Sequence, residues 1–233
     1  MKLFDGQSRE KICTRDYRWG QLSLALVPGF LFHLLCTVVG WTLREKVEGE
    51  LKTSDSAPIV VVYHREFPIT LSAQRTWKKL FKGVGYLGIH NWISYCTSVL
   101  CYLDGLPAVR YDRRTGLKPL NQVLDFLRQN RPLPFAIRTD SGGPYNRVRS
   151  SVVRMALEAN RPIVCVRQTS DHTVRIFDHF FPLPFSHVVT RVSDPIVPQA
   201  LSHLTMEDAT ARVQFVMDYL AESDAVRAQL VSV

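Results

Sequence analysis

Three polar side chains follow short apolar runs in this chain of 233 residues. His64 comes directly after "PIVVVY", Arg110 follows "LPAV", and Asp140 ends "PFAIRTD". If these runs are strands of a parallel sheet, their carboxyl ends meet at one edge, where such folds bind ligands. A histidine can act there as a general base, and an arginine can bind phosphate. We therefore interpret the three residues as one candidate enzyme site.

Each of the three residues also has an ordinary interpretation. A histidine at a strand end can be structural, and Arg110 can be a surface cation beside Asp112. Asp140 can simply open a turn before the glycines that follow it. Their joint occurrence at predicted strand ends favours an enzyme site over these ordinary interpretations.

The order of the expected elements supports a sheet edge of this kind. Strands are expected at residues 59–64, 106–111, 134–140, 161–168, 173–177 and 187–192. Helices are expected at residues 91–103, 115–130, 150–160 and 205–223, the last capped by Thr205. This alternation predicts an α/β fold with a mostly parallel central sheet flanked by helices.

An apolar segment precedes this domain. From Trp19 to Leu43 there is no Asp, Glu, Lys or Arg, and a bilayer span needs about 20 such residues. Pro28–Gly29 is expected to break the helix, which favours a helical hairpin dipping into one leaflet. A single span and a buried core helix are the alternatives. We expect residues 1–50 to dock on a membrane and residues 51–233 to form the α/β domain.

Basic residues flank the apolar segment on both sides, so the charge-bias rule gives no orientation. They are Lys11, Arg15 and Arg18 before it, and Arg44 and Lys46 after it. A hairpin would keep both ends on the cytoplasmic face. We therefore expect a protein of the inner (cytoplasmic) membrane, with membrane lipids as partners and its α/β domain facing the cytoplasm.

The overall charge points to an anionic partner. The formal net charge is +8 and the isoelectric point about 9.4, which suits nucleic acid, acidic lipid or a phosphorylated substrate. The chain has no C2H2, basic-zipper or RNP-like motif, so nucleic acid is not expected. Its five cysteines show no metal-ligand spacing, so no metal is expected and reduced thiols are the simple interpretation.

Four sequence blocks between Pro58 and Pro198 occur in a characteristic order. They are "VVVYHREFPI" with His64, "GLPAVR" with Gly105 and Arg110, "RTDSGGPYNRV" with Asp140, Gly142 and Gly143, and "RPIVCV". In this order they resemble the lysophospholipid acyltransferase (glycerolphosphate acyltransferase-like) superfamily. The third block is similar to the Asp-Gly-Pro form of an uncharacterised bacterial branch of that superfamily.

The resemblance implies an O-acyltransferase that moves a fatty acyl group from an acyl thioester to a hydroxyl of a lysophospholipid or related glycolipid. His64 would be the general base. The acceptor site would draw on Arg65, Gly105, Arg110, Arg113, Asp140, Gly142 and Gly143. No cofactor is implied, because the acyl donor, acyl-coenzyme A or acyl carrier protein, is itself a substrate.

One position departs from the family pattern. Well-known members carry His-x4-Asp, but Ile69 stands where that aspartate would be. The bacterial branch often lacks the aspartate as well. In a strand, Glu66 would share a face with His64, so we predict Glu66 as the catalytic carboxylate, with Asp104 and Asp140 as alternatives.

Two other classes of function stay open at this stage. The missing aspartate favours a catalytically degenerate, membrane-bound lipid-binding or scaffold protein on the same fold. A transferase with a phosphorylated donor is the other hypothesis, although no P-loop or GxGxxG follows any expected strand.

Overall fold

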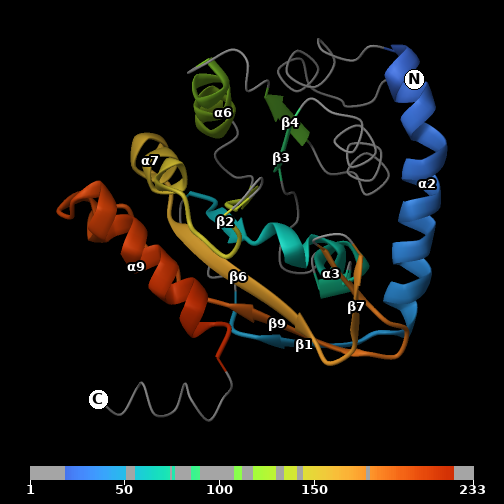
Figure 1. The fold of residues 1–233 in the computed structure, drawn as a ribbon. Helices are drawn as coiled ribbons and strands as arrows, with labels where there is room; N and C mark the ends of the chain where they lie inside the picture. Colours follow the sequence, from blue (N-terminus) through green and yellow to red (C-terminus); the bar gives the residue numbers. More distant parts are fainter. Residues whose placement is uncertain are drawn as a thin grey trace.

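The computed structural model describes residues 19–50, 56–73, 75–76, 85–89, 108–111, 118–129, 134–140, 144–176 and 179–222. A seven-stranded sheet with the order β1-β9-β6-β2-β5-β3-β4 forms its centre (Figure 1). Every neighbouring pair in this sheet is parallel except β6 and β9. The predicted α/β class with a mostly parallel central sheet is therefore confirmed.

The described strands and helices have the following bounds. The main-sheet strands are β1 (Arg44–Glu48), β2 (Ile59–Val62), β3 (Gly85–Ile89), β4 (Ala108–Tyr111), β5 (Phe135–Arg138), β6 (Ile163–Ser170) and β9 (His187–Val192). A separate two-stranded sheet consists of β7 (Thr173–Ile176) and β8 (His179–Pro182). The helices are α2 (Trp19–Thr42), the 3-10 turn η1 (His64–Glu66), α3 (Phe67–Ser72), α6 (Lys118–Gln129), α7 (Ser150–Ala159), α8 (Gln199–Ser202) and α9 (Met206–Tyr219).

Most of the predicted elements occur where the pattern put them, with trimmed ends. The strand expected at 173–177 does form, but it pairs with β8 outside the main sheet. The strands β1, β3 and β8 were not predicted. Thr205 caps α9 as expected, because its side-chain oxygen accepts the backbone N–H of Asp208 at 3.1 Å. The helix expected at 91–103 lies outside the described residues.

The central strand β2 is buried on both faces, which explains its unbroken run of apolar residues. On one face Ile59, Val61 and Tyr63 belong to the core cluster that includes residues of α6, α7 and α9. On the other face Val60 and Val62 pack with apolar residues of β5, β6 and β9. Figure 1 shows α6, α7 and α9 on one side of the sheet, with α2, α3 and β7 on the other.

The apolar N-terminal segment is a single helix, so the predicted break at Pro28–Gly29 is wrong. α2 continues through Pro28 over 24 residues. A proline removes one backbone hydrogen bond from a helix, and packing against the domain offsets that loss. Cys36 is buried against Leu71 of α3, and a Cβ at Gly40 would lie 2.2 Å from the carbonyl oxygen of Ser72. Within the part of the chain that the structure describes, no helix is long and apolar enough to cross a membrane.

Candidate active site

His64 lies directly after β2, at the carboxyl edge of the parallel strands. The strand ends at Val62, and His64 begins η1, which is closed by a bond from the N–H of Glu66 to the carbonyl of Tyr63 at 3.3 Å. The strand predicted through His64 is thus two residues too long. The reason is that the N–H of His64 donates to Asp140 Oδ1 at 2.6 Å rather than to a strand neighbour. The backbone turns there, and the half-buried imidazole is presented beyond the sheet.

Asp140 fixes this turn from the neighbouring strand end. The residue is fully buried, and its second oxygen, Oδ2, accepts the backbone N–H of Asn146 at 2.9 Å. Asn146 has a φ of 58°, a left-handed conformation that asparagine tolerates better than most residues. The carboxylate therefore joins the start of η1 to the turn at residues 144–146. Its contribution to substrate binding stays a prediction, and these contacts give it a positioning role.

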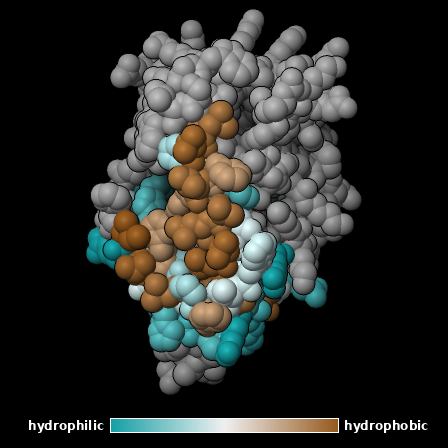
Figure 2. Space-filling view, turned by 90° about the vertical axis from the view of Figure 1, so that its right-hand side faces the viewer, coloured by the Kyte–Doolittle hydropathy of each residue, from teal (hydrophilic) through white to brown (hydrophobic). Residues whose placement is uncertain are grey.

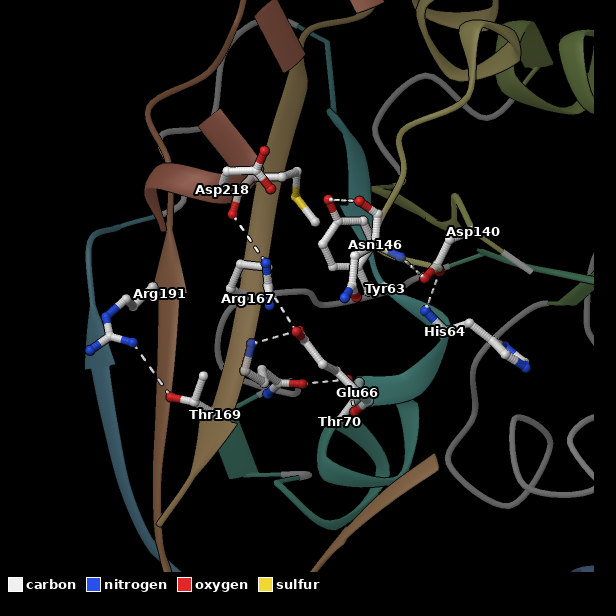
Figure 3. Close-up of polar contacts among 12 residues, drawn as sticks. Tyr63, His64, Glu66, Thr70, Asp140, Asn146, Arg167, Thr169, Arg191 and Asp218 are labelled. Atoms are coloured by element: carbon white, nitrogen blue, oxygen red, sulfur yellow. Dashed lines mark hydrogen bonds and ion pairs between the residues drawn. The ribbon is translucent and has the colours of Figure 1, made fainter. Parts of the chain in front are cut away.

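Glu66 lies on the other side of η1, away from the imidazole. Its Oε1 accepts Arg167 Nε at 2.7 Å, and its Oε2 accepts the backbone N–H of Gln168 at 3.0 Å. In Figure 3 its carboxylate points toward β6, whereas the ring of His64 points to the opposite side. Burial raises the pKa of the Glu66 carboxyl above 4.5, and the charge of Arg167 acts against this rise. The catalytic role predicted for Glu66 stays a prediction, and none of these contacts supports it.

The geometric argument for Glu66 also changes. A shared face with His64 was expected from a strand, in which residues two apart point the same way. Here both residues lie in a 3-10 turn, where three residues complete a full turn. The two side chains therefore diverge.

Tyr63 and Arg167 extend the polar network behind η1. The Arg167 guanidinium lies 4.6 Å from the centre of the Tyr63 ring, and its Nη1 donates to the carbonyl of Met217 at 3.2 Å. The Tyr63 hydroxyl donates to the carbonyl of Asn146 at 3.2 Å and accepts Gln214 Nε2 at 2.9 Å. Burial raises the pKa of Tyr63 to about 12. This network ties β2 to β6 and α9, and so holds the sheet edge that carries His64.

A second histidine lies beside His64, and sequence reasoning missed it. The ring centroids of His64 and His179 are 4.4 Å apart, and the ring planes meet at 65°. His179 is the first residue of β8, far from His64 in the sequence and at no recognisable spacing from it. No local signal could have found this pair, because the fold-back of β7 and β8 creates it.

Two arginines adjoin η1 and α3. The guanidinium of Arg65, a predicted substrate-binding residue, lies 4.2 Å from the centre of the Tyr145 ring. Arg138, which was not predicted as a site residue, lies 4.5 Å from the centre of the Phe67 ring. Burial lowers the pKa of Arg138 to about 9, so its guanidinium is still charged at neutral pH. One described cation thus belongs to η1 itself, and another lies against the first residue of α3.

The other predicted residues are placed less fully. Arg110 lies in β4, and strand pairing sets its backbone level with Gly88 of β3. β4 is three strand positions from β2, or about 14 Å at the usual spacing. Gly105, Arg113, Gly142 and Gly143 lie outside the described residues, as does the alternative carboxylate Asp104.

Ile69 occupies a core position rather than a site position. It is 2% exposed and packs with Leu43, Ala73 and Val188. The residue that stands in place of the family aspartate is thus enclosed in apolar surroundings. At this position an apolar side chain that packs in the core stands in place of the family carboxylate.

The structure offers no metal site within the described residues, since no group of three or more His, Cys, Asp and Glu could hold an ion there. The described side chains around His64 instead provide an imidazole pair and cations. Such a set can accept a proton from a hydroxyl and attract an anionic group.

Comparisons with known proteins support the fold. No family model matches the chain, and none of the curated proteins matches it. Among solved structures it is similar to the crystal structure of the 1-acyl-sn-glycerophosphate (LPA) acyltransferase PlsC from Thermotoga maritima. The similarity has a TM-score of 0.52 at 18% identity and covers 89% of this chain and 83% of that chain. At this identity the match shows a shared fold, which is the fold that the sequence blocks led us to expect.

Proposed function

We propose that this protein is an O-acyltransferase that transfers a fatty acyl group from an acyl thioester to a hydroxyl of a lysophospholipid or related lipid. The observation that carries the proposal is the presentation of His64 beyond the carboxyl edge of a sheet similar to that of a glycerophosphate acyltransferase. The hydrogen bond that the His64 backbone N–H donates to Asp140 supports it, because a catalytic base needs a fixed backbone.

His64 acts in this proposal as the general base. It takes the proton of the acceptor hydroxyl while the oxygen attacks the thioester carbonyl. A carbon–oxygen bond forms, the carbon–sulfur bond breaks, and the imidazolium returns the proton to the departing sulfur. An imidazole with an ordinary pKa of about 6.5 suits this exchange at neutral pH.

The acceptor is expected to carry an anionic headgroup. Arg65 belongs to η1 and the Arg138 guanidinium lies over the ring of Phe67, which follows η1, and arginine binds phosphate in a bidentate manner. Arg110, Arg113, Gly105, Gly142 and Gly143 are included in the acceptor site on their sequence positions alone. The donor is acyl-coenzyme A or acyl carrier protein, and carrier protein is then a protein partner.

The outer face of α2 is proposed as the membrane-docking surface. Figure 2 shows a band of apolar side chains along this side of the molecule. The band includes Val27, Leu31, Leu34, Val38 and Trp41, which are 46% to 66% exposed. Their spacing puts them on one side of the helix, as in helices that lie in a bilayer interface.

Two neighbouring features favour a lipid surface as the occupant of this face. Phe185, which is 70% exposed, lies next to the end of α2, because its N–H donates to Thr42 Oγ1 at 3.1 Å. Arg44 and Lys46 follow α2 and are exposed, as expected for contact with anionic headgroups. We infer an association with the cytoplasmic side of the inner membrane.

The decisive experiment compares the wild-type protein with His64→Ala in lipid vesicles supplied with radiolabelled acyl-coenzyme A, acyl carrier protein and a panel of lysolipids. We expect labelled diacyl product from wild type and a loss of about 10²–10⁴-fold in the variant. His203→Ala, at an exposed position in the turn after α8, is the matched control. A wild-type protein that acylates no acceptor would refute the enzyme.

The buried Ile69 favours one alternative, a lipid-binding protein that has lost catalysis. That function predicts vesicle binding with no transfer to any acceptor. The same assay therefore separates the two proposals.

The docking surface is tested by Leu31→Glu with Val38→Glu, measured by co-sedimentation with anionic vesicles. We expect vesicle binding to fall strongly, because two charges then face the apolar phase. Phe215→Glu, on the exposed side of α9 and 62% exposed, is the control and should bind as wild type does. Equal binding of all three proteins would place the contact elsewhere.

A further inference from the structure

The two-stranded sheet of β7 and β8 has one apolar face that is partly exposed. β7 has the sequence "TVRI", and residues two apart in a strand share a face. Val174 and Ile176 therefore lie on one face, and they are 42% and 44% exposed. Strand pairing puts Phe181 opposite Val174 and His179 opposite Ile176, which places all four side chains on the same face. Val174, Ile176 and Phe181 are called the hairpin surface below.

One end of the hairpin surface adjoins α2. Phe181 contacts Phe32 of α2 edge-on, with ring centroids 5.9 Å apart. Phe32 precedes the exposed positions Leu34 and Val38 on the same helix, and these belong to the proposed docking face. In Figure 1 β7 lies beside α2, and Figure 2 shows apolar side chains next to the band along that helix. The hairpin surface therefore extends the apolar side of the molecule inward from α2.

The other end of the hairpin surface lies at the proposed base. The ring centroids of His179 and His64 are 4.4 Å apart, and β8 also contacts η1 and α3. His179 and Phe181 are two positions apart in β8, or about 7 Å along the strand. The hairpin surface thus covers the distance between α2 and the His64 ring.

Building on the proposed acyl transfer, we propose that the hairpin surface binds the hydrocarbon chain of the lysolipid acceptor and so brings its hydroxyl to His64. In a lysolipid, the chain and the reacting hydroxyl are attached to the same small backbone. A hydroxyl at His64 therefore needs an apolar contact for the chain close by. The hairpin surface begins at that point, because Ile176 is paired with His179.

The acceptor chain fits this surface better than the donor chain does. The acceptor is a membrane lipid, and it reaches the protein along the apolar face of α2, which the Phe181–Phe32 contact joins to the hairpin surface. The thioester donor is carried by coenzyme A or by a carrier protein, both of which are soluble in water and approach from solvent. Continuity with the docking face therefore favours the acceptor.

The hairpin is anchored from its opposite face. Phe180 alternates with the residues of the hairpin surface and packs against a cluster that includes Leu43, Ile69 and Val188. One face of the sheet is thus joined to the core, while the other keeps two aliphatic side chains exposed. A surface formed in advance binds a flexible chain without the cost of ordering a loop first.

The first test is photolabelling of the wild-type protein on vesicles of anionic phospholipid. The probe is a lysophospholipid with a diazirine in its acyl chain, and labelled peptides are identified by mass spectrometry. We expect label on β7 and β8 as well as on α2. Unlabelled lysophospholipid should suppress the label on β7 and β8 but not that on α2, because a binding site saturates and a bilayer contact does not.

Two further arms of the experiment separate the other sources of a hydrocarbon chain. A diacyl phospholipid with the same diazirine should label α2 and leave β7 and β8 with little label. Equal labelling by both probes, without suppression, would make the hairpin a general bilayer contact and overturn the proposal. Suppression by acyl-coenzyme A but not by lysophospholipid would assign the surface to the donor chain and overturn it too.

The second test combines Val174→Thr with Ile176→Thr, which keeps both side chains β-branched and adds a hydroxyl to each. We expect KM for a long-chain lysolipid to rise about tenfold, with a smaller change in kcat, because hydroxyls replace methyls that the chain covers. With an acceptor of very short chain, KM should match that of wild type. Val47→Thr, at a valine of β1 that is 39% exposed, is the matched control and should leave both KM values unchanged.

Two kinetic outcomes would contradict the proposal. One is an unchanged KM for the long-chain acceptor in the double variant, and the other is an equal rise for both acceptors. Suppressible label on β7 in a protein that transfers no acyl group would uphold chain binding and refute the proposed reaction. Acyl transfer by a wild type whose β7 and β8 carry no suppressible label would do the reverse.

Discussion

The polar side chains on the two sides of η1 have different kinds of partner. On the β6 side, Glu66 is 6% exposed and its two oxygens accept the Arg167 side chain and the Gln168 amide. On the other side, the half-buried ring of His64 meets the ring of a second histidine. A satisfied buried ion pair holds its surroundings in one arrangement, whereas an imidazole with a ring neighbour can still exchange a proton. The first side therefore stabilises the sheet edge, and the second carries the histidine that serves as base in the proposed reaction.

The largest effect on stability is expected on the β6 side. Glu66→Gln leaves the buried Arg167 charge without its counter-ion, so the free energy of unfolding should fall by about 3–5 kcal/mol. Urea denaturation followed by circular dichroism measures it. Glu158→Gln, which breaks the more exposed pair with Arg154, should cost less than about 1 kcal/mol. Equal losses in the two variants would contradict the division between the two sides.

Asp140 links both sides of η1, and its substitution should have the second-largest effect on stability. Asp140→Ala removes the acceptor of two backbone amides, those of His64 and Asn146. We expect a loss of about 2–3 kcal/mol in unfolding free energy, together with a fall in kcat because the base is no longer fixed. Asp140→Asn keeps one acceptor oxygen and should lose less. Full activity in Asp140→Ala would show that the turn at His64 is held by other contacts.

Tyr63 should show a smaller effect with a characteristic pH dependence. Tyr63→Phe removes the hydroxyl between Asn146 and Gln214 and should cost about 1 kcal/mol at neutral pH. The raised pKa of about 12 in the folded protein, against 10 in the unfolded chain, means that the unfolded state loses this proton first. The contribution of Tyr63 is therefore complete below pH 10 and declines as the pH rises toward 12.

Denaturation at pH 9 and pH 11 measures this dependence. Between these two values the unfolding free energy of wild type should fall by about 1 kcal/mol more than that of Tyr63→Phe. Parallel losses in both proteins would mean that the Tyr63 hydroxyl is not shielded from water as its burial indicates.

The smallest effect on stability is expected for His64 itself. His64→Ala should change the unfolding free energy by less than about 1 kcal/mol, because the backbone bond to Asp140 remains and the ring is only half-buried. Its acyl-transfer activity should fall as described above. A large loss of stability in this variant would assign His64 to the structural side of η1.

Local sequence patterns were sufficient to predict much of the fold. The apolar run of β2, the alternation of strands and helices, and the Thr205 cap follow from the immediate sequence, and all three are found. The positions of His64 and Asp140 after strands were predicted for the same reason. The side-chain directions were not found, because they depend on bonds between distant segments. Glu66 turns to Arg167, and His64 meets His179.

The sequence by itself determined the α/β class, the order of its main elements and the presence of a histidine after the central strand. These properties depend on hydrophobic periodicity and capping, which act over a few residues. The tertiary structure decided that η1 replaces the end of that strand, that α2 continues through Pro28, and that His179 lies against His64. Each of these results from contacts between segments remote in sequence, whether hydrogen bonds or packing, whose energy exceeds the local preference of any one residue.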